Sequence, residues 1–145
     1  MDNFAYEGCP MENCNKKLIP KGDDTFSCGK CGKTTSTFVY KYMLRASIAD
    51  ATDNQWVTAF DEVARVIFGV TADDLMKKKD KDMKAFDSVV YKTKFQRFNF
   101  RLLCKSEIFS GENRLKVTVI SAKKVDSGGQ DHLQKVKMEI EKMNL

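Results

Sequence analysis

Hydrophobic and polar residues alternate strictly in the middle of the chain, and this pattern predicts β-strands. Over residues 38–48 every even-numbered position is aromatic or aliphatic, whereas the odd-numbered positions include charged residues. A period of two places these two sets on opposite faces of a strand. Residues 55–60 continue the pattern, with Trp56 and Phe60 on the face opposite Val57. We therefore expect two strands joined by a turn.

Three helices are predicted after these strands. Residues 61–68 form a helix that ends at Gly69, because glycine readily adopts the left-handed conformation that closes a helix. A second helix begins after Thr71, whose side chain can cap it. We expect the lysine-rich residues 77–82 to be a solvent-exposed junction, followed by a third helix over about residues 81–92. The apolar side of this third helix consists of Met83, Phe86 and Val90.

A second pair of strands is predicted over residues 95–109 and 114–125, with a hairpin turn between them. Apolar residues again occupy alternate positions, and we expect this set to face a core. It consists of Phe98, Phe100, Leu102, Cys104, Leu115, Val117 and Val119. The opposite faces of all the predicted strands gather positive charge from Lys41, Arg45, Arg97, Arg101, Lys105, Arg114 and Lys116.

A last amphipathic helix is predicted over residues 131–144, after a pair of glycines at 128–129. Its apolar residues, spaced by three, four and three, are Leu133, Val136, Ile140 and Met143. At ~1.5 Å per residue the helix is about 21 Å long, and an isolated helix of this length is only marginally stable in water. Its apolar stripe must be buried, either against the rest of this chain or against a partner.

Four of the five cysteines lie within the first 31 residues, in two close pairs. The pairs are Cys9 and Cys14, separated by four residues, and Cys28 and Cys31, separated by two. Gly29 and Gly32 flank Cys31, as expected of a tight turn that needs positive φ and backbone N–H groups near the sulfur. Paired thiolates in a chain with no predicted export signal favour Zn²⁺ over disulfides. We expect a zinc ribbon over about residues 6–35, with one structural Zn²⁺ held by all four thiolates.

Composition fits one compact domain that does not cross a membrane. The chain has 145 residues, of which 42% are hydrophobic and 31% charged, and no apolar stretch is long enough for a transmembrane helix. Lys and Arg exceed Asp and Glu by 25 to 20, a net charge of +5, and four thiolates on Zn²⁺ reduce it to about +3. This charge permits a polyanionic partner without requiring one. No phosphate-binding loop, nucleophile elbow or paired-histidine motif is present, so we expect neither an enzyme nor a small-molecule substrate.

The basic strand faces allow two interpretations. Single-stranded nucleic acid is bound by cations that contact phosphates and by aromatic rings that stack on bases, and Trp56, Phe60 and Phe109 can supply the rings. Alternatively, the basic faces are merely solvated, and Trp56 and Phe60 pack beneath the helix that follows. The pattern of residues alone leaves both interpretations open.

Several segments resemble one known family in their order and spacing. Examples are YEGCP at residues 6–10, NCNKK at 13–17, FSCGKC at 26–31 and NQWVTAF at 54–60; FVYKY at 38–42, FNFR at 98–101 and ENRLKVTV at 112–119 add to them. Together they resemble the C-terminal DNA-binding domain of the large subunit of replication protein A, a eukaryotic heterotrimer that binds single-stranded DNA. The resemblance covers nearly the whole chain. Paralogues that serve in telomerase and meiotic complexes fit the same motifs.

The resemblance implies a mainly β fold with helices: an OB-fold β-barrel that carries an inserted four-cysteine zinc ribbon and a C-terminal amphipathic helix. Residues 1–145 would be a single domain, with the barrel over about residues 36–125. The implied partners are single-stranded DNA and two smaller OB-fold subunits, joined through C-terminal helices in a heterotrimer. The implied location is the nucleus, and the implied role is DNA replication, repair, recombination or telomere maintenance. Neither a membrane nor a small molecule is among the implied partners.

By matching position, the resemblance implies that Phe60 and Phe109 stack on bases and that Lys41, Arg114 and Lys116 contact phosphates; the charge pattern adds Trp56 and Arg45. A second hypothesis is an assembly module of a telomerase-associated or meiotic paralogue, with weak DNA affinity of its own. One departure is that the family has a barrel strand before the ribbon, whereas residues 1–8 do not predict one. We therefore expect the first strand to lie upstream, or the barrel to close differently.

Overall fold

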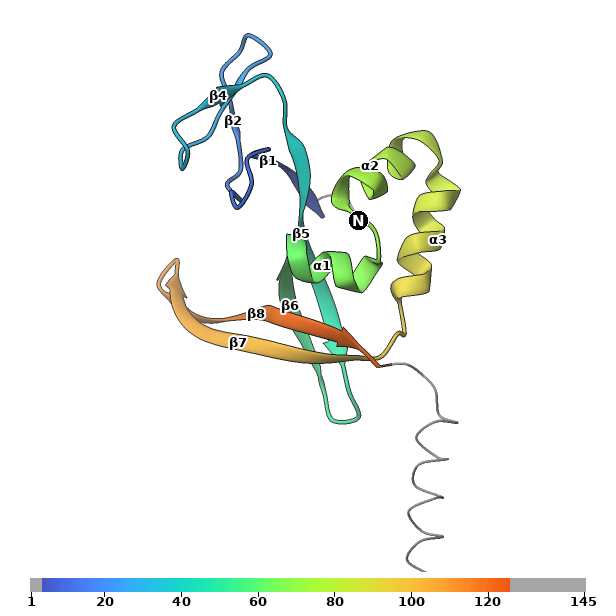
Figure 1. Ribbon diagram of the computed structural model, residues 1–145. Helices are drawn as coiled ribbons and strands as arrows, with labels where there is room; N and C mark the ends of the chain where they lie inside the picture. Colours follow the sequence, from blue (N-terminus) through green and yellow to red (C-terminus); the bar gives the residue numbers. More distant parts are fainter. Residues whose placement is uncertain (1–3, 126–145) are drawn as a thin grey trace, which may run out of the picture.

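The computed structural model describes residues 4–125, and its main feature is a mixed sheet of five strands (Figure 1). The strands, in their order across the sheet, are β1 (Ala5–Gly8), β5 (Val39–Ala49), β6 (Asn54–Phe60), β8 (Glu112–Lys124) and β7 (Phe98–Phe109). Neighbours are antiparallel except β6 and β8, which are parallel. Strands β1 and β7 form the two edges of the sheet. The expectation of a mainly β fold is confirmed.

Three helices connect β6 to β7 within the described residues, and they cover one side of the sheet (Figure 1). They are α1 (Asp61–Phe68), α2 (Ala72–Lys81) and α3 (Met83–Thr93). As predicted, α1 ends at Gly69 in the left-handed conformation, with φ of 72°. The Thr71 side chain caps α2 by accepting a hydrogen bond from the Asp74 N–H at 3.2 Å. Both signals lie in the local sequence, which explains why these boundaries are predictable.

The core lies between the sheet and the helices, on the face that the alternation predicted. Strand residues Tyr42, Leu44, Val57, Ala59, Val117 and Val119 are buried together with Phe4 and with helix residues Ala64, Phe68, Ala72, Leu75 and Phe86. At ~25 cal/mol per Å² of buried apolar area, this cluster supplies the main driving force for folding.

Several expectations are wrong in detail. A strand does precede the ribbon, because Ala5–Gly8 pairs with β5; four residues that end in glycine were too short for a periodic signal. The lysine-rich residues 77–82 are not a junction, since α2 continues to Lys81. In α3, Phe86 is buried but Met83 is 54% exposed.

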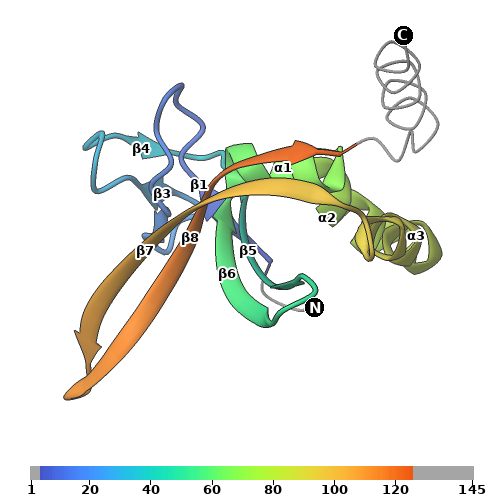
Figure 2. The same cartoon turned by 90° about the horizontal axis from the view of Figure 1, so that it is seen from below.

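The inward face of the second hairpin is only partly buried. Cys104 and Leu115 are exposed, although the alternation placed both in the core. Residues 101–116, which we call the arm, are all exposed because this part of the hairpin extends beyond the helices (Figure 2). Its tip is a tight turn with Ser110 and Gly111 at positive φ, as a two-residue hairpin loop requires.

Two helix carboxylates complete the hydrogen bonding of β5 beyond the end of β6. The Tyr42 N–H donates to Asp61 Oδ1 at 3.0 Å, and the Tyr40 N–H donates to Asp73 Oδ1 at 3.0 Å. Asp61 is 6% exposed and forms a 2.7 Å ion pair with Arg65. These bonds replace those of a neighbouring strand and fix α1 and α2 against the sheet.

A small three-stranded sheet is inserted between β1 and β5, with strands β2 (Ile19–Pro20), β3 (Phe26–Ser27) and β4 (Thr34–Thr35). We call residues 9–35 the ribbon. Its core is separate and consists largely of cysteine, with Leu18 as the buried aliphatic residue. The ribbon and the tip of the arm lie on the side of the molecule away from the helices (Figures 1 and 2). The helix predicted over residues 131–144 lies outside the described residues, and within them no helix is long and apolar enough to cross a membrane.

Candidate nucleic-acid interface and metal centre

The ribbon brings the four predicted cysteine ligands together. The sulfur atoms of Cys9, Cys14, Cys28 and Cys31 all lie within 4.8 Å of one another. Cys14 Sγ and Cys28 Sγ are 3.6 Å apart, close to the roughly 3.8 Å between sulfurs in a tetrahedron with Zn–S bonds of about 2.3 Å. All the cysteines are free thiols. This donor set fits a tetrahedral, thiolate-bound metal ion.

Tight turns hold each cysteine pair in place. Gly32 has φ of 67°, and its N–H donates to the Cys28 carbonyl at 2.9 Å. In the other turn Asn13, with φ of 59°, takes the left-handed position, which asparagine tolerates better than most residues. The expectation of positive φ is therefore confirmed for Gly32 but is wrong for Gly29, which is not among the positive-φ residues.

The thiols differ in acidity because their hydrogen-bond surroundings differ. The Cys31 N–H lies 3.4 Å from Cys28 Sγ and, as the main cause, lowers the pKa of Cys28 to about 6. Hydrogen bonding to Cys14 raises the pKa of Cys31 to about 12. Cys28 therefore forms a thiolate more readily than Cys31, and a cation among the sulfurs would favour the thiolate form of Cys31.

The second candidate site is the side of the sheet that faces away from the core, which we call the outer face. Strand register defines it: Met43 pairs with Phe60, Arg45 with Thr58, and Ser47 with Trp56. Thr58 pairs in turn with Thr118 on β8. The outer face continues along the arm with Lys105, Glu107, Phe109, Arg114 and Lys116.

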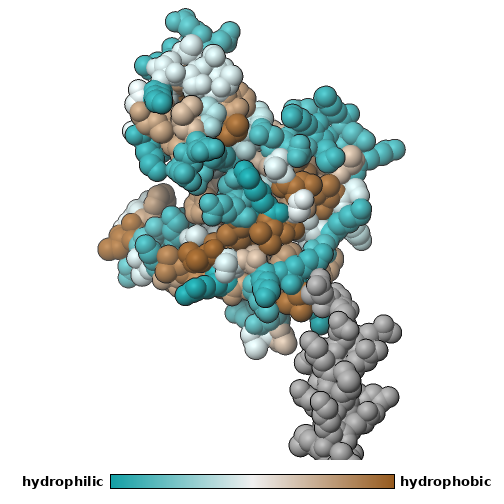
Figure 3. Space-filling view, in the orientation of Figure 1, coloured by the Kyte–Doolittle hydropathy of each residue, from teal (hydrophilic) through white to brown (hydrophobic). Residues whose placement is uncertain are grey.

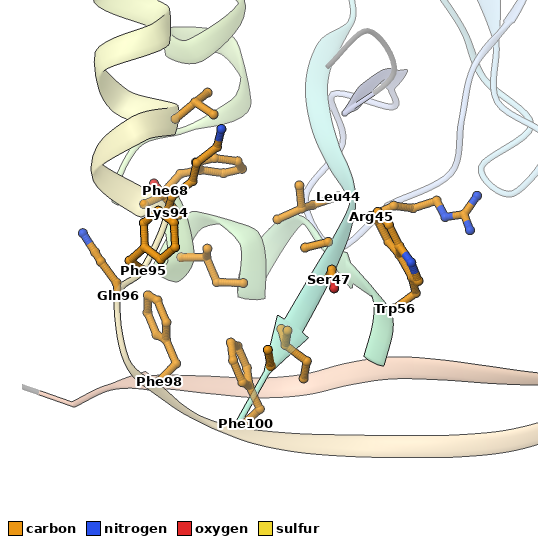
Figure 4. Close-up of a pocket in the computed structure, with 16 residues that line it drawn as sticks. Leu44, Arg45, Ser47, Trp56, Phe68, Lys94, Phe95, Gln96, Phe98 and Phe100 are labelled. Carbon is orange, nitrogen blue, oxygen red and sulfur yellow. The ribbon is translucent and has the colours of Figure 1, made fainter. Parts of the chain in front are cut away.

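Three large aromatic side chains on the outer face are exposed to solvent. Trp56 is 61% exposed, Phe60 45% and Phe109 62%. Trp56 and Phe60 do not pack under α1, so the alternative in which that helix covers them is wrong. Figure 4 shows Trp56 and Arg45 on the opposite side of β5 from Phe68 and Phe95.

Cationic side chains accompany these rings. Arg45 and Arg114 are exposed, and the Arg114 guanidinium lies 5.7 Å from the centre of the Phe109 ring. Lys116 is about half exposed and lies 3.9 Å from the Glu107 carboxylate; such an exposed pair is weak. Figure 3 shows a notch between the ribbon and the arm. Exposed aromatic rings with cationic side chains beside them suit a flexible polyanion that carries planar aromatic groups.

Lys41 occupies a different position from the other predicted cations. Its Nζ donates hydrogen bonds to the Cys14 carbonyl at 2.9 Å and to Asn15 Oδ1 at 2.8 Å. The neighbouring Tyr6 hydroxyl donates to the Asn15 carbonyl at 2.8 Å. Sequence reasoning missed Tyr6 and Asn15, because their partners lie on segments that only the folded chain brings together.

An apolar cavity of about 520 Å³ opens at the other end of β5, beside the end of α3 and the start of β7, and its lining includes Arg45 and Trp56 of the outer face. Phe95, Phe98 and Phe100 contribute to its wall (Figure 4). It carries few polar groups and no cluster of titratable side chains, so we do not assign the function to it.

Comparison with known families and proteins gives consistent matches. Residues 1–133 match the family described as the Replication factor-A C terminal domain. The chain is 42% identical over 125 residues to the replication protein A 70 kDa DNA-binding subunit of Danio rerio, which covers 86% of this chain and 21% of that protein. It is 34% identical over 119 residues to replication factor A protein 1 of Saccharomyces cerevisiae, covering 82% of this chain and 19% of that one. The chain thus spans about a fifth of these relatives.

Solved structures agree with the sequence matches. A yeast replication protein A bound to single-stranded DNA matches with a TM-score of 0.77 and 30% identity, over 97% of this chain and 79% of that one. A replication protein A heterotrimer bound to single-stranded DNA matches with a TM-score of 0.80 and 27% identity, over 95% of this chain and 32% of that one.

Proposed function

The chain belongs to the replication factor-A C-terminal domain family, and from this premise we propose that it is a non-catalytic module that binds single-stranded DNA along its outer face. The observation that carries the proposal is the exposure of Trp56, Phe60 and Phe109 on one face of a sheet whose other face is core. Exposing large aromatic rings to water is unfavourable, and stacking on the bases of single-stranded DNA would remove them from water. Arg45, Arg114 and Lys116 would contact the phosphates.

Trp56 provides a direct test because it is the only tryptophan in the chain and is 61% exposed. A base stacked on the indole should quench its fluorescence. Titration with mixed-sequence and telomeric-repeat oligonucleotides is expected to give saturable quenching with both, since stacking is tolerant of sequence. Double-stranded DNA of the same length is the control. Unchanged fluorescence with no binding in a parallel anisotropy titration would contradict the proposal and leave an assembly role.

We propose further that the fold is a partly open OB barrel and that the ribbon is a zinc ribbon with one structural Zn²⁺ on Cys9, Cys14, Cys28 and Cys31. The donor set supports this, because four cysteine sulfurs fill a tetrahedron and leave no position for a reactive water. The ion would supply most of the stability of the ribbon, whose own core is small. Native mass spectrometry should find one zinc per chain.

The third part of the proposal is assembly. We propose that the chain works in the nucleus as part of a heterotrimer with two smaller OB-fold subunits, in DNA replication and related processes. One of the structural relatives is a replication protein A heterotrimer, and this similarity supports the proposed assembly. The stripe of Leu133, Val136, Ile140 and Met143, outside the described residues, would pack in a bundle with a helix from each partner. Co-purification of the three subunits tests this.

A further inference from the structure

Tyr6 and Lys41, which are neighbours on adjacent strands of the main sheet, both form hydrogen bonds with the Cys14–Asn15 segment of the ribbon. Tyr6 on β1 lies directly opposite Lys41 on β5, so both side chains point to the same side of the sheet. The Tyr6 hydroxyl and the Lys41 ammonium together reach Cys14 and Asn15. These hydrogen bonds therefore link the main sheet to a predicted metal ligand, Cys14, and to the residue that follows it.

Gly8 shows how closely the Lys41 side chain lies on the chain beneath it. A Cβ atom on Gly8 would lie 2.8 Å from Lys41 Cγ and Cδ, closer than unbonded carbons approach. Gly8 is not among the residues with positive φ, so its backbone conformation does not require glycine. Space for the Lys41 stem is therefore the reason that glycine is needed at this position.

The ammonium group of Lys41 already has acceptors within the protein. A lysine has three N–H donors, and two of them are used by the Cys14 carbonyl and Asn15 Oδ1. Lys41 is also only partly exposed, unlike Arg45 and Arg114. To bind a phosphate, it would have to release the ribbon or share its remaining donor.

We propose that Lys41 is a positioning residue that fixes the ribbon against the sheet, with Tyr6 as its companion, rather than a phosphate contact. By holding Cys14 and Asn15, it sets where the ribbon stands at the end of the outer face and so fixes one wall of the path for DNA. Only the DNA readout of this inference rests on the proposed function. How firmly the ribbon is held against the sheet can be measured without DNA.

The test uses the 145-residue chain as purified, with Lys41→Met and Gly8→Ala, and with Lys33→Met, an exposed lysine of the same ribbon, as the matched control. Hydrogen exchange of ribbon amides should become faster in the first two variants and stay unchanged in the control. Gly8→Ala is decisive because it keeps the Lys41 charge and only displaces the side chain. Asn15→Ala should give part of the effect of Lys41→Met and add nothing to it in the double variant.

Measurements of DNA binding distinguish a positioning role of Lys41 from a direct contact with a phosphate. Lys41→Met and Gly8→Ala should weaken binding by roughly 2- to 30-fold, the range of indirect coupling between sites, while the slope of log K against log salt stays as in the parent. A phosphate contact predicts instead a slope shallower by about 0.7 for Lys41→Met and normal binding by Gly8→Ala; either result, or unchanged ribbon exchange, overturns the inference. If ribbon exchange is faster in Lys41→Met and Gly8→Ala but the parent chain binds no DNA, the proposed function is refuted and the positioning role is supported.

Discussion

Replacing Phe109 by alanine isolates the contribution of one stacking ring. The side chain is 62% exposed at the tip of the arm, and the Arg114 guanidinium lies 5.7 Å from the centre of its ring. An exposed contact of this type contributes about 0.5–1 kcal/mol, and little apolar area is buried. The free energy of unfolding should therefore change by less than about 1 kcal/mol.

The effect on DNA should be larger. One base stacked on an aromatic ring contributes about 1–3 kcal/mol by alanine replacement, so the Kd should rise by about 5- to 160-fold. Phe60→Ala should fall in the same range. Phe60 is the N-cap residue of α1 but makes no side-chain capping hydrogen bond, so its loss should not uncap the helix.

The assay is fluorescence anisotropy with a labelled single strand at fixed salt, and Phe95→Ala is the matched control. Phe95 is 96% exposed but lies at the end of α3, on the other side of β5 from Trp56 (Figure 4). If Phe109→Ala and Phe95→Ala bind equally well while both remain folded, exposure on the outer face does not indicate stacking, and the reasoning fails.

Four further changes test other parts of the structure. Lys116→Gln should make the slope of log K against log salt shallower by about 0.7, with similar losses for all DNA sequences; an unchanged slope would exclude a phosphate contact. Cys14→Ser should abolish zinc binding by native mass spectrometry and unfold the ribbon while the separate sheet core stays folded; retention of a full zinc would contradict the ligand assignment. Asp61→Ala should cost about 1–3 kcal/mol in urea unfolding, since it strands the buried Tyr42 N–H, whereas removal of the half-exposed partner in Arg65→Ala should cost less than about 1 kcal/mol. Leu133→Asp combined with Ile140→Asp should prevent co-purification with the two partner subunits; intact assembly together with a less stable chain would place the helix on its own domain.

Local signals in the sequence predicted the elements whose boundaries depend on neighbouring residues. Gly69 and Thr71 end one helix and begin the next through hydrogen bonds within a few residues, so their effect is visible in the sequence. The four cysteines were equally visible, because metal ligands of one type cluster at short spacing. By contrast, β1 is a strand only because β5 pairs with it, and four residues cannot display a period.

The arm shows the limit of periodicity. Alternation tells which side chains share a face, and it was correct along the arm, up to the register shift between Arg101 and Leu102: Cys104 and Leu115 do lie on the same side as Val117. It cannot tell whether another layer covers that face. Helix α1 covers Val117 and Val119, while the arm extends past the helices and leaves Cys104 and Leu115 exposed. Burial depends on the length of a neighbouring element, which no strand pattern contains.

The same reasoning explains why the two interpretations of Trp56 and Phe60 could not be separated in the sequence. Helix α1 starts immediately after Phe60 and could have folded back over either face of β6. The buried carboxylate of Asp61, bonded to the Tyr42 N–H, holds the first turn of α1 at the end of β6. From there Ala64 and Phe68 enter the core, so the helix lies on the inner face. The outer face keeps its exposed rings because the apolar side of α1 packs in the core on the other face, and the hydrogen bond between Asp61 and the Tyr42 N–H, residues 19 apart, helps to hold the helix there.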